Sequence, residues 1–186
     1  MTDTSAEALC ALHDSLWQII CRGPAEATAA ARHLTLATTG RDGAPQLRMV
    51  ILRAADRAAA TLDIHTDLRS GKIAALRADP RAEALFWDPQ ARIQIRASGR
   101  AAIISGAEAA SLWARVPAAA RPVYGAAPPP GTPIPGPLAY EPADGAAVFG
   151  VIRLTLGRIE ALHLGERHRR ACFDRQDGWR GQWLSP

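Results

Sequence analysis

The feature that most constrains this fold is a pair of β-type segments early in the chain, joined by a tight turn. Residues His33 to Thr39 alternate in polarity and are rich in threonine, which predicts a strand. The sequence Gly40-Arg41-Asp42-Gly43 follows as a hairpin signal, and Pro45 to Arg53 is the next predicted strand. In a dinucleotide-binding α/β fold a helix would follow the first strand, so this start argues against that class.

Further strand-like segments alternate with short helical ones along the rest of the chain. Gly99 lies inside a long strand-like segment, where a glycine predicts a bulge or a bend. Six to eight mostly antiparallel strands predict a mainly β fold, a β-barrel with peripheral helices. The other expected strands are 61–66, 81–87, 91–104, 148–164, 170–174 and 179–184, and the expected helical segments are 5–21, 25–32, 70–77, 107–115 and 118–124.

Length and composition predict a single domain over residues 1–186, with helices in 1–32. Hydrophobic residues make up 48% of the chain and charged residues 22%, as in ordinary globular proteins. No apolar run is long enough to cross a membrane, and Met1-Thr2-Asp3-Thr4 lacks a basic signal region, so we expect a cytoplasmic protein without a membrane partner. The Pro- and Gly-rich segment 125–147 is interpreted as an ordered surface loop or an arm across a partner subunit, with disorder as the alternative.

The chemistry of metals and of common hydrolases finds no support in the sequence. Three cysteines without a Cys-x-x-Cys pair and five histidines without a paired spacing predict no metal site. There is no Gly-x-Ser-x-Gly elbow, and the catalytic residues stay unassigned. The net charge of +4 is modest and no basic run is present, so an anionic small ligand explains the charge as well as nucleic acid does. Few aromatic residues lie near the arginines, which makes nucleic acid the weakest alternative.

A candidate anion site lies between Arg48 and Lys72. Arg48 sits inside an apolar stretch, where an unpaired charge would be costly. The segment Arg69-Ser70-Gly71-Lys72 opens a predicted helix directly after a strand, which brings backbone N–H groups, a hydroxyl and positive charge together. Lys72 is the only lysine among 22 Lys and Arg, which favours a specific role for its compact ammonium group over chance. The spacing does not match a P-loop, so a simpler phosphate cradle is predicted, with a plain helix cap by Ser70 as the alternative.

Three further polar residues are ambiguous from the sequence alone. Arg53 has the opposite strand parity to Arg48, so both can serve one site only if the strand ends or bulges between them; otherwise Arg53 is a solvated charge. His65 can face a ligand or be a hydrogen-bonded core histidine. Gln94 can bond a heterocycle if its strand face meets a ligand, and has no such role if that face meets water.

Taken in order, these residues resemble the pyridoxamine 5'-phosphate oxidase family of FMN-binding split barrels. The resemblance covers most of the chain, and its specificity comes from the ordered set rather than from one motif. The matching segments are Leu36-Ala37-Thr38 with Gly43 and Pro45, Arg48 to Arg53, His65-Thr66-Asp67, Arg69 to Lys72, Asp79-Pro80-Arg81, Leu85-Phe86-Trp87, Gln94 to Gly99, Arg158-Ile159-Glu160, His168-Arg169-Arg170, Gly178-Trp179 and Leu184-Ser185-Pro186.

The resemblance implies an antiparallel split β-barrel of the FMN-binding type and a homodimer with two FMN sites at the subunit interface. It implies that Arg48 and Lys72, with Ser70, hold the FMN phosphate. Gln94 is implied to come from the partner subunit, Arg170 to lie near the flavin, and His168 to be a substrate residue. The remaining implied cofactor contacts are Met49, Val50, Ile51, Arg53, His65, Thr66 and Gly71.

The chain also departs from the family at several positions. Family oxidases have lysine where this chain has Arg53, and their Tyr, Arg and Ser substrate clamp is not matched in the segment 112–120. A late flavin-contacting tryptophan is replaced near Leu162, and a late substrate arginine falls near Glu166. We therefore expect an FMN-dependent oxidoreductase acting on an unknown small molecule rather than on pyridoxine phosphate. A non-catalytic flavin or haem carrier on the same fold is the alternative.

Overall fold

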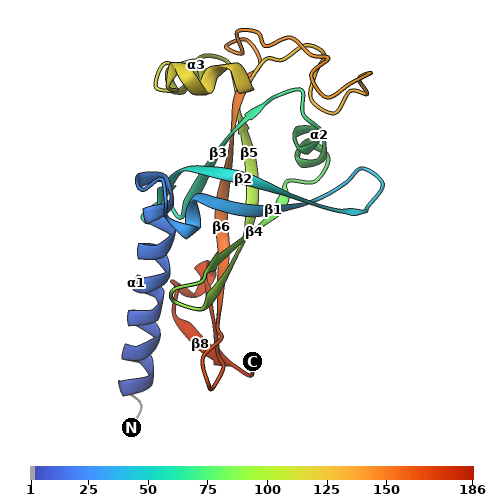
Figure 1. The fold of residues 1–186 in the computed structure, drawn as a ribbon. Coiled ribbons are helices and arrows are strands. Elements are labelled where there is room, and N and C mark those ends of the chain that lie inside the picture. Colours follow the sequence, from blue (N-terminus) through green and yellow to red (C-terminus); the bar gives the residue numbers. More distant parts are fainter. Residues whose placement is uncertain (1–2) are drawn as a thin grey trace.

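The computed structural model describes residues 3–186, and its elements follow the predicted order (Figure 1). Residues 1 and 2, the start of the predicted N-terminal helical segment, lie outside the described residues. The helices are α1 (Asp3–Ala25), α2 (Gly71–Ala78) and α3 (Gly106–Trp113), with short 3-10 helices η1 (Ala30–Arg32), η2 (Ala118–Val123) and η3 (Arg175–Asp177). The strands are β1 (His33–Thr39), β2 (Pro45–Asp56), β3 (Thr61–Asp67), β4 (Arg81–Asp88), β5 (Ile93–Ile104), β6 (Phe149–His163), β7 (Arg169–Asp174) and β8 (Gly181–Leu184).

Six of the strands close into an antiparallel barrel. The sheet order is β3-β2-β1-β4-β5-β6-β7-β8, and β3 also pairs with β6, which closes the ring. Strand β6 changes neighbours along its length, because residues 149–155 pair with β3 and residues 158–163 pair with β7. This exchange of partners splits the barrel and confirms the predicted mainly β, antiparallel split-barrel fold. Figure 1 shows β6 running the length of the molecule, from α3 to β8.

The partner exchange is accommodated by Gly99. The register between β5 and β6 shifts between Ser98 and Gly99, and Gly157 of β6 is the unpaired residue, so the bulge predicted at this point of the long strand is confirmed. A Cβ atom on Gly99 would lie 2.1 Å from the carbonyl oxygen of Thr155, a distance that no side chain tolerates. Glycine is therefore required at this point for the two strand backbones to approach each other.

A second bulge lies at Arg53. The β2–β3 register passes from Leu52 directly to Ala54, so Arg53 is the extra residue. The sequence predicted that this strand ends at Arg53, but β2 continues to Asp56. A bulge leaves one residue without a ladder partner and re-aims its side chain, so strict alternation from Arg48 does not fix the direction of Arg53.

Helix α1 covers one end of the barrel and is longer than predicted. Its buried residues Leu16, Trp17 and Ile20 join the barrel core, which includes Leu34 and Leu52. The helix passes through Gly23-Pro24 to Ala25, so this pair is not the predicted stop. Gly23 instead allows close packing, because a Cβ there would lie 2.7 Å from the carbonyl oxygen of Ala31. No helix within residues 3–186 is long and apolar enough to cross a membrane.

The Pro- and Gly-rich segment 125–147 forms an irregular loop that is tied at its base. Its two sides meet at an isolated bridge, in which Ala127 and Glu141 exchange backbone hydrogen bonds of 2.9 and 2.8 Å. The backbone N–H of Gly125 donates to the Asp67 carboxylate at the end of β3. In Figure 1 the loop extends from the α3 end of the barrel past α2. We call this segment the arm.

Candidate functional site

Arg48 lies on the inner side of β2 and contacts only neutral acceptors. Its Nη1 donates to Thr38 Oγ1 at 2.7 Å and to the carbonyl oxygen of Leu36 at 3.3 Å. Nη2 donates to Gln46 Oε1 at 3.1 Å. Burial lowers the pKa of Arg48. The guanidinium is thus held in a fixed direction, while its charge is not neutralised by these neighbours.

Lys72 lies in the first turn of α2, above two buried hydroxyl groups. Its ammonium donates to Thr66 Oγ1 at 3.0 Å and to Ser70 Oγ at 3.2 Å. Ser70 occupies the N-cap position of α2, yet its side chain forms no capping hydrogen bond. The plain helix-cap interpretation of Ser70 is therefore wrong, and its hydroxyl faces Lys72 and Thr66 instead.

Arg48 and Lys72 act on each other electrostatically. The pKa of Lys72 is lowered first by burial and then by the positive charge of Arg48, with Asp67 opposing. Among the side chains that the structure describes, those of residues 5–186, neither cation forms an ion pair with a carboxylate. Two neighbouring cations without a counter-ion, beside three hydroxyls and the N–H groups of a helix start, fit a phosphate dianion. We call Arg48, Lys72, Thr38, Thr66 and Ser70 the Arg48–Lys72 cluster.

Asp67 is close to this cluster, but its negative charge is neutralised by Arg69. Its carboxylate accepts hydrogen bonds from Arg69 N, Nε and Nη2 at 2.8, 3.0 and 2.6 Å. Burial alone would raise the pKa of Asp67, but hydrogen bonds from Arg69 and Gly125 outweigh it and hold the pKa below its usual value. Arg69 thereby neutralises the one buried carboxylate beside Lys72.

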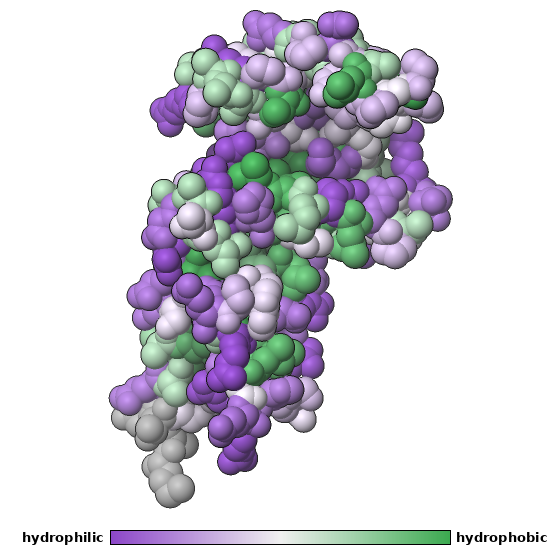
Figure 2. All heavy atoms as spheres, viewed as in Figure 1, coloured by the Kyte–Doolittle hydropathy of each residue, from purple (hydrophilic) through white to green (hydrophobic). Residues whose placement is uncertain are grey.

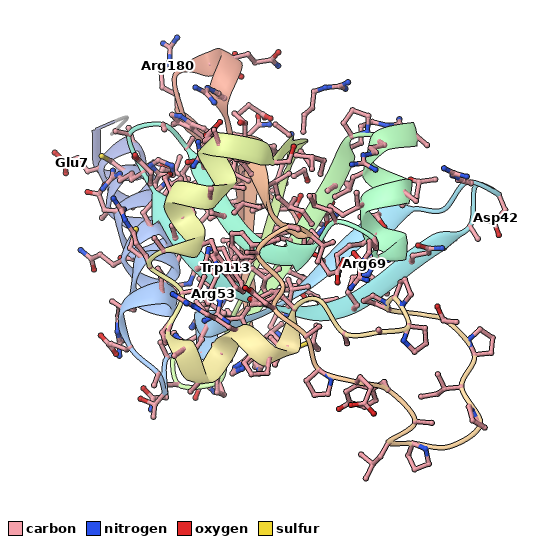
Figure 3. All side chains as sticks on the ribbon, turned by 90° about the horizontal axis from the view of Figure 1, so that it is seen from above. Glu7, Asp42, Arg53, Arg69, Trp113 and Arg180 are labelled. Carbon is pink, nitrogen blue, oxygen red and sulfur yellow. The ribbon has the colours of Figure 1, made fainter. Side chains whose placement is uncertain are left out.

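Arg53 and His65 lie in a neighbouring cavity of about 290 Å³. Its far wall is the last turn of α3 and the chain that follows, including Leu112 and Arg115. Figure 3 shows Arg53 beside the α3 end that carries Trp113. Burial first, and then the charge of Arg53, lowers the pKa of His65 to about 4, so this imidazole is neutral at physiological pH. We call this the Arg53 cavity. His65 and Thr66 are successive residues of β3, so one strand serves both the cavity and the Arg48–Lys72 cluster.

Arg115 is a candidate site residue that sequence reasoning missed. It lines the Arg53 cavity together with Arg32, and no hydrogen bond or ion pair of either side chain occurs in the described part of the chain. The only signal for Arg115 was its place in the segment 112–120, where the family resemblance puts a substrate clamp. Sequence spacing alone could not bring it to Arg53, more than sixty positions earlier in the chain.

Gln94, Arg170 and His168 lie elsewhere in the chain. Gln94 pairs with Leu162 near the end of β6, and Arg170 pairs with the same residue from the other side. Arg170 donates from Nε and Nη2 to Glu160 Oε1 at 3.0 and 2.8 Å. His168 is exposed in the turn between β6 and β7. His65 pairs with Val151 at the start of β6, so roughly 36 Å of strand separates it from Gln94.

The remaining predicted contacts lie on or beside β2. Met49 is 64% exposed, whereas Val50 and Ile51 are half-buried. Gly71 opens α2 with free space where a side chain would lie. Met49 shares the outer sheet face with Leu47, Leu85 and Trp87, all of them exposed. We call these four residues the apolar sheet face. Figure 2 shows apolar surface in the middle of the view, where Figure 1 places β1, β2 and β4.

Comparison with known sequences agrees with this geometry. A family model described as pyridoxamine 5'-phosphate oxidase, FMN-binding domain, matches residues 14–105. A pyridoxine/pyridoxamine 5'-phosphate oxidase of Thermosynechococcus vestitus is 29% identical over 153 residues, covering 82% of this chain and 63% of the relative. One from Anaeromyxobacter dehalogenans is 38% identical over 96 residues, covering 52% and 46%. The chain thus spans less than two thirds of the length of these relatives.

Solved structures share the fold. A pyridoxamine 5'-phosphate oxidase-related, FMN-binding protein from Nostoc punctiforme superposes with a TM-score of 0.74 at 25% identity, covering 93% of this chain and 96% of the other. PhzG from Burkholderia lata, solved with tetrahydrophenazine-1-carboxylic acid, has a TM-score of 0.62 at 21% identity, covering 98% and 91%, and shows the fold alone.

The barrel and the match to the family model define the class as an FMN-binding split barrel. Residues 14–105 match the FMN-binding domain of the pyridoxamine 5'-phosphate oxidase family, and this match supports FMN as the cofactor.

Proposed function

We propose that this chain is an FMN-dependent oxidoreductase whose substrate is a small anionic molecule other than pyridoxine phosphate. The observation that carries the proposal is that Arg48 and Lys72 are neighbouring cations without a counter-ion among the side chains of residues 5–186. A structural role would call for a carboxylate partner, because two neighbouring, half-buried like charges repel each other. A phosphate dianion supplies the missing charge.

In this proposal Arg48, Lys72 and Ser70 hold the FMN phosphate, with Thr66 and the N–H groups of Gly71 and Lys72. Charge-assisted hydrogen bonds from two cations suit a dianion better than neutral contacts do. The hydroxyls already orient the Lys72 ammonium, so little side-chain freedom remains to be lost on binding.

The ring of the flavin would lie along Met49, Val50 and Ile51, with His65 and Arg53 at its edge. His65 is neutral, so it can donate one hydrogen bond and accept another without adding charge. Bound flavin would supply the electron transfer itself, while the protein binds, orients and tunes it.

The Arg53 cavity supports the assignment of an anionic substrate. Arg32, Arg53 and Arg115 bring three guanidinium groups to its wall, while Asp63 is engaged by Arg153 at 2.8 and 2.7 Å. A positively charged cavity attracts a carboxylate or a phosphate. The lysine and the Tyr–Ser pair of the family clamp are not present, which separates this substrate from pyridoxine phosphate.

We further propose a homodimer in which each flavin contacts both subunits. The roughly 36 Å of strand between His65 and Gln94 supports this, because one mononucleotide cannot contact both residues within a single chain. The apolar sheet face gives a second argument, since Leu47 and Met49 are 69% and 64% exposed on adjoining positions of one sheet.

The first experiment is to purify the protein without added cofactor, record its visible spectrum and titrate the apoprotein with FMN. A yellow protein, or one that takes up FMN stoichiometrically, is the expected result. A colourless protein that does not take up FMN would remove the proposal.

The second experiment tests for catalysis. After anaerobic photoreduction, the reduced protein is mixed with candidate acceptors, and small aromatic and aliphatic acids are then offered as donors to the oxidised protein. Reoxidation with turnover is expected of an oxidoreductase. A flavin that exchanges electrons with no donor or acceptor would identify a non-catalytic carrier.

A further inference from the structure

A second cavity lies away from the proposed FMN site, between α1 and the chain that enters β8. Its volume is about 520 Å³, within the range of small-molecule sites. Leu9, Cys10, His13 and Trp17 line it from α1, and Arg57 and Trp179 line it from the other side. Figure 1 shows α1 running alongside the C-terminal strands here. We call it the His13 cavity. None of the residues assigned above to FMN or its substrate lines it.

Flat aromatic side chains form its wall. The His13 ring stacks on Trp179 with ring centroids 5.7 Å apart and an angle of 22° between the planes. Phe173 supports the same imidazole at 4.9 Å. Trp17 Nε1 donates to His13 Nε2 at 3.2 Å, which fixes the orientation of the imidazole. Such a wall favours a flat apolar ring, because aromatic faces gain most from offset stacking.

His13 presents an unused hydrogen-bond donor to this cavity. The side chain is only 9% exposed, and its Nε2 is the acceptor for Trp17, so the neutral ring carries its proton on Nδ1. Among residues 5–186, whose side chains the structure describes, no hydrogen bond involves Nδ1, and no side-chain nitrogen or oxygen is both fully buried and unpaired. Nδ1 therefore reaches the cavity surface, where it can meet an acceptor.

The cavity also has a cation at its rim. Arg57 pairs with Asp14, and both side chains are about half exposed. The pKa of His13 is lowered first by burial and then by Arg57, while Asp14 opposes these effects less strongly. Arg57 and Arg180 line the cavity whereas Asp14 does not, so the cavity favours an anionic acceptor over a neutral one.

We propose that the His13 cavity is a second ligand site that takes a flat aromatic acid, with its ring on the Trp179 wall and its carboxylate toward His13 Nδ1–H and Arg57. The site is independent of FMN, so its test does not depend on the proposed function.

The test uses the FMN-saturated protein and 2-naphthoate as the probe, followed by titration calorimetry and by quenching of tryptophan fluorescence. We expect a Kd below about 1 mM, and a Kd roughly fivefold or more higher for the neutral naphthalene-2-carboxamide. Saturation with FMN keeps the probe out of the flavin site. No binding of 2-naphthoate at millimolar concentrations would overturn the proposal, and equal affinity for the amide would overturn the assignment of an acid.

Two substitutions on α1 locate the binding. Ala6 is exposed and lines the cavity, so Ala6→Trp fills the space without removing any contact. We expect it to weaken 2-naphthoate about tenfold or more, with the flavin spectrum unchanged. Gln18→Trp places the same side chain at an exposed α1 position outside this cavity and should leave the affinity unchanged. Undiminished binding to the Ala6→Trp protein would place the probe elsewhere and refute the site.

Cys10 gives an independent readout. It is exposed and lines the cavity, whereas Cys21 is half-buried and outside it. Bound 2-naphthoate should slow the alkylation of Cys10 by N-ethylmaleimide, as followed by peptide mass spectrometry, and should leave Cys21 unaffected. An unchanged Cys10 rate at saturating 2-naphthoate would contradict the proposed location.

Discussion

Lys72 holds a position at which two hydroxyls fix its ammonium and a second cation faces it. We predict that Lys72→Ala weakens FMN by about 1.5–3 kcal/mol, roughly 10- to 150-fold in Kd, because a charged hydrogen bond to the phosphate is lost. Calorimetric titration of the apoprotein measures this loss. Arg77→Ala, at an exposed position near the other end of α2, is the control and should leave FMN affinity unchanged. An equal loss of FMN affinity in both variants would show that Lys72 does not bind the phosphate specifically.

His65 makes the stability of the protein depend on pH. Its folded-state pKa of about 4 lies below the usual 6.5, so the unfolded chain binds a proton more readily. The resulting stability is fully present above about pH 6.5 and is lost as pH falls toward 4, by up to about 3 kcal/mol. Urea unfolding across this range should show a shallower pH dependence in His65→Gln. A variant with the wild-type slope would show that His65 is not the titrating group.

At the residue scale, the sequence located the cation pair but not the whole site. Arg48 could be predicted because a charge inside an apolar strand demands an explanation, and Lys72 because it is a solitary lysine at a helix start. Arg115 could not be predicted as a site residue, since it reaches Arg53 only when the chain after α3 folds back over β2 and β3. Local pattern reveals unusual residues, whereas tertiary packing decides which of them meet.

At the scale of elements, Gly99 is the point where β6 exchanges β3 for β7. We predict that Gly99→Ala destabilises the protein by about 2 kcal/mol or more, because a Cβ would collide with the Thr155 carbonyl oxygen. The change is measured by urea unfolding. Gly157→Ala is the matched control in the same bulge, because the nearest atom to a new Cβ at this unpaired residue of β6 is 4.0 Å away. If the two variants lose similar stability, the bulge is not a steric requirement.

Most elements could be predicted from periodicity and turn residues, and β1 agrees at both ends. The differences arise where tertiary contacts override a local signal. Pro24 was expected to end α1, but the helix carries it in its last turn while Gly23 packs against Ala31. Strand β2 was expected to end at Arg53, but a bulge absorbs that residue and the ladder continues. A bulge leaves no trace in hydrophobic alternation unless a glycine marks it, as Gly99 does.

At the scale of the molecule, the apolar sheet face is the proposed subunit contact. We predict that Trp87→Glu, which puts a charge into this face, shifts the protein to a monomer and weakens FMN, because each site would lose its contribution from the partner. Sedimentation velocity and FMN titration measure the two effects. Gln18→Glu on exposed α1 adds the same charge outside this face and should change neither. If the Trp87→Glu protein keeps the molecular mass in solution and the FMN affinity of the wild type, the apolar sheet face is not the subunit contact.

The buried carboxylate of Asp67 joins two parts of the molecule that are nearly sixty positions apart in sequence. It accepts hydrogen bonds from Arg69, just before α2, and from Gly125, where the arm begins, and Arg69 Nη2 adds a hydrogen bond of 2.9 Å to the carbonyl oxygen of Ala126. A single anchor therefore restrains both segments. A ligand that restrains the loop before α2 through this anchor must therefore also restrain the arm. By thermodynamic reciprocity, a molecule that binds the arm through the same anchor must change the affinity for a ligand at Lys72.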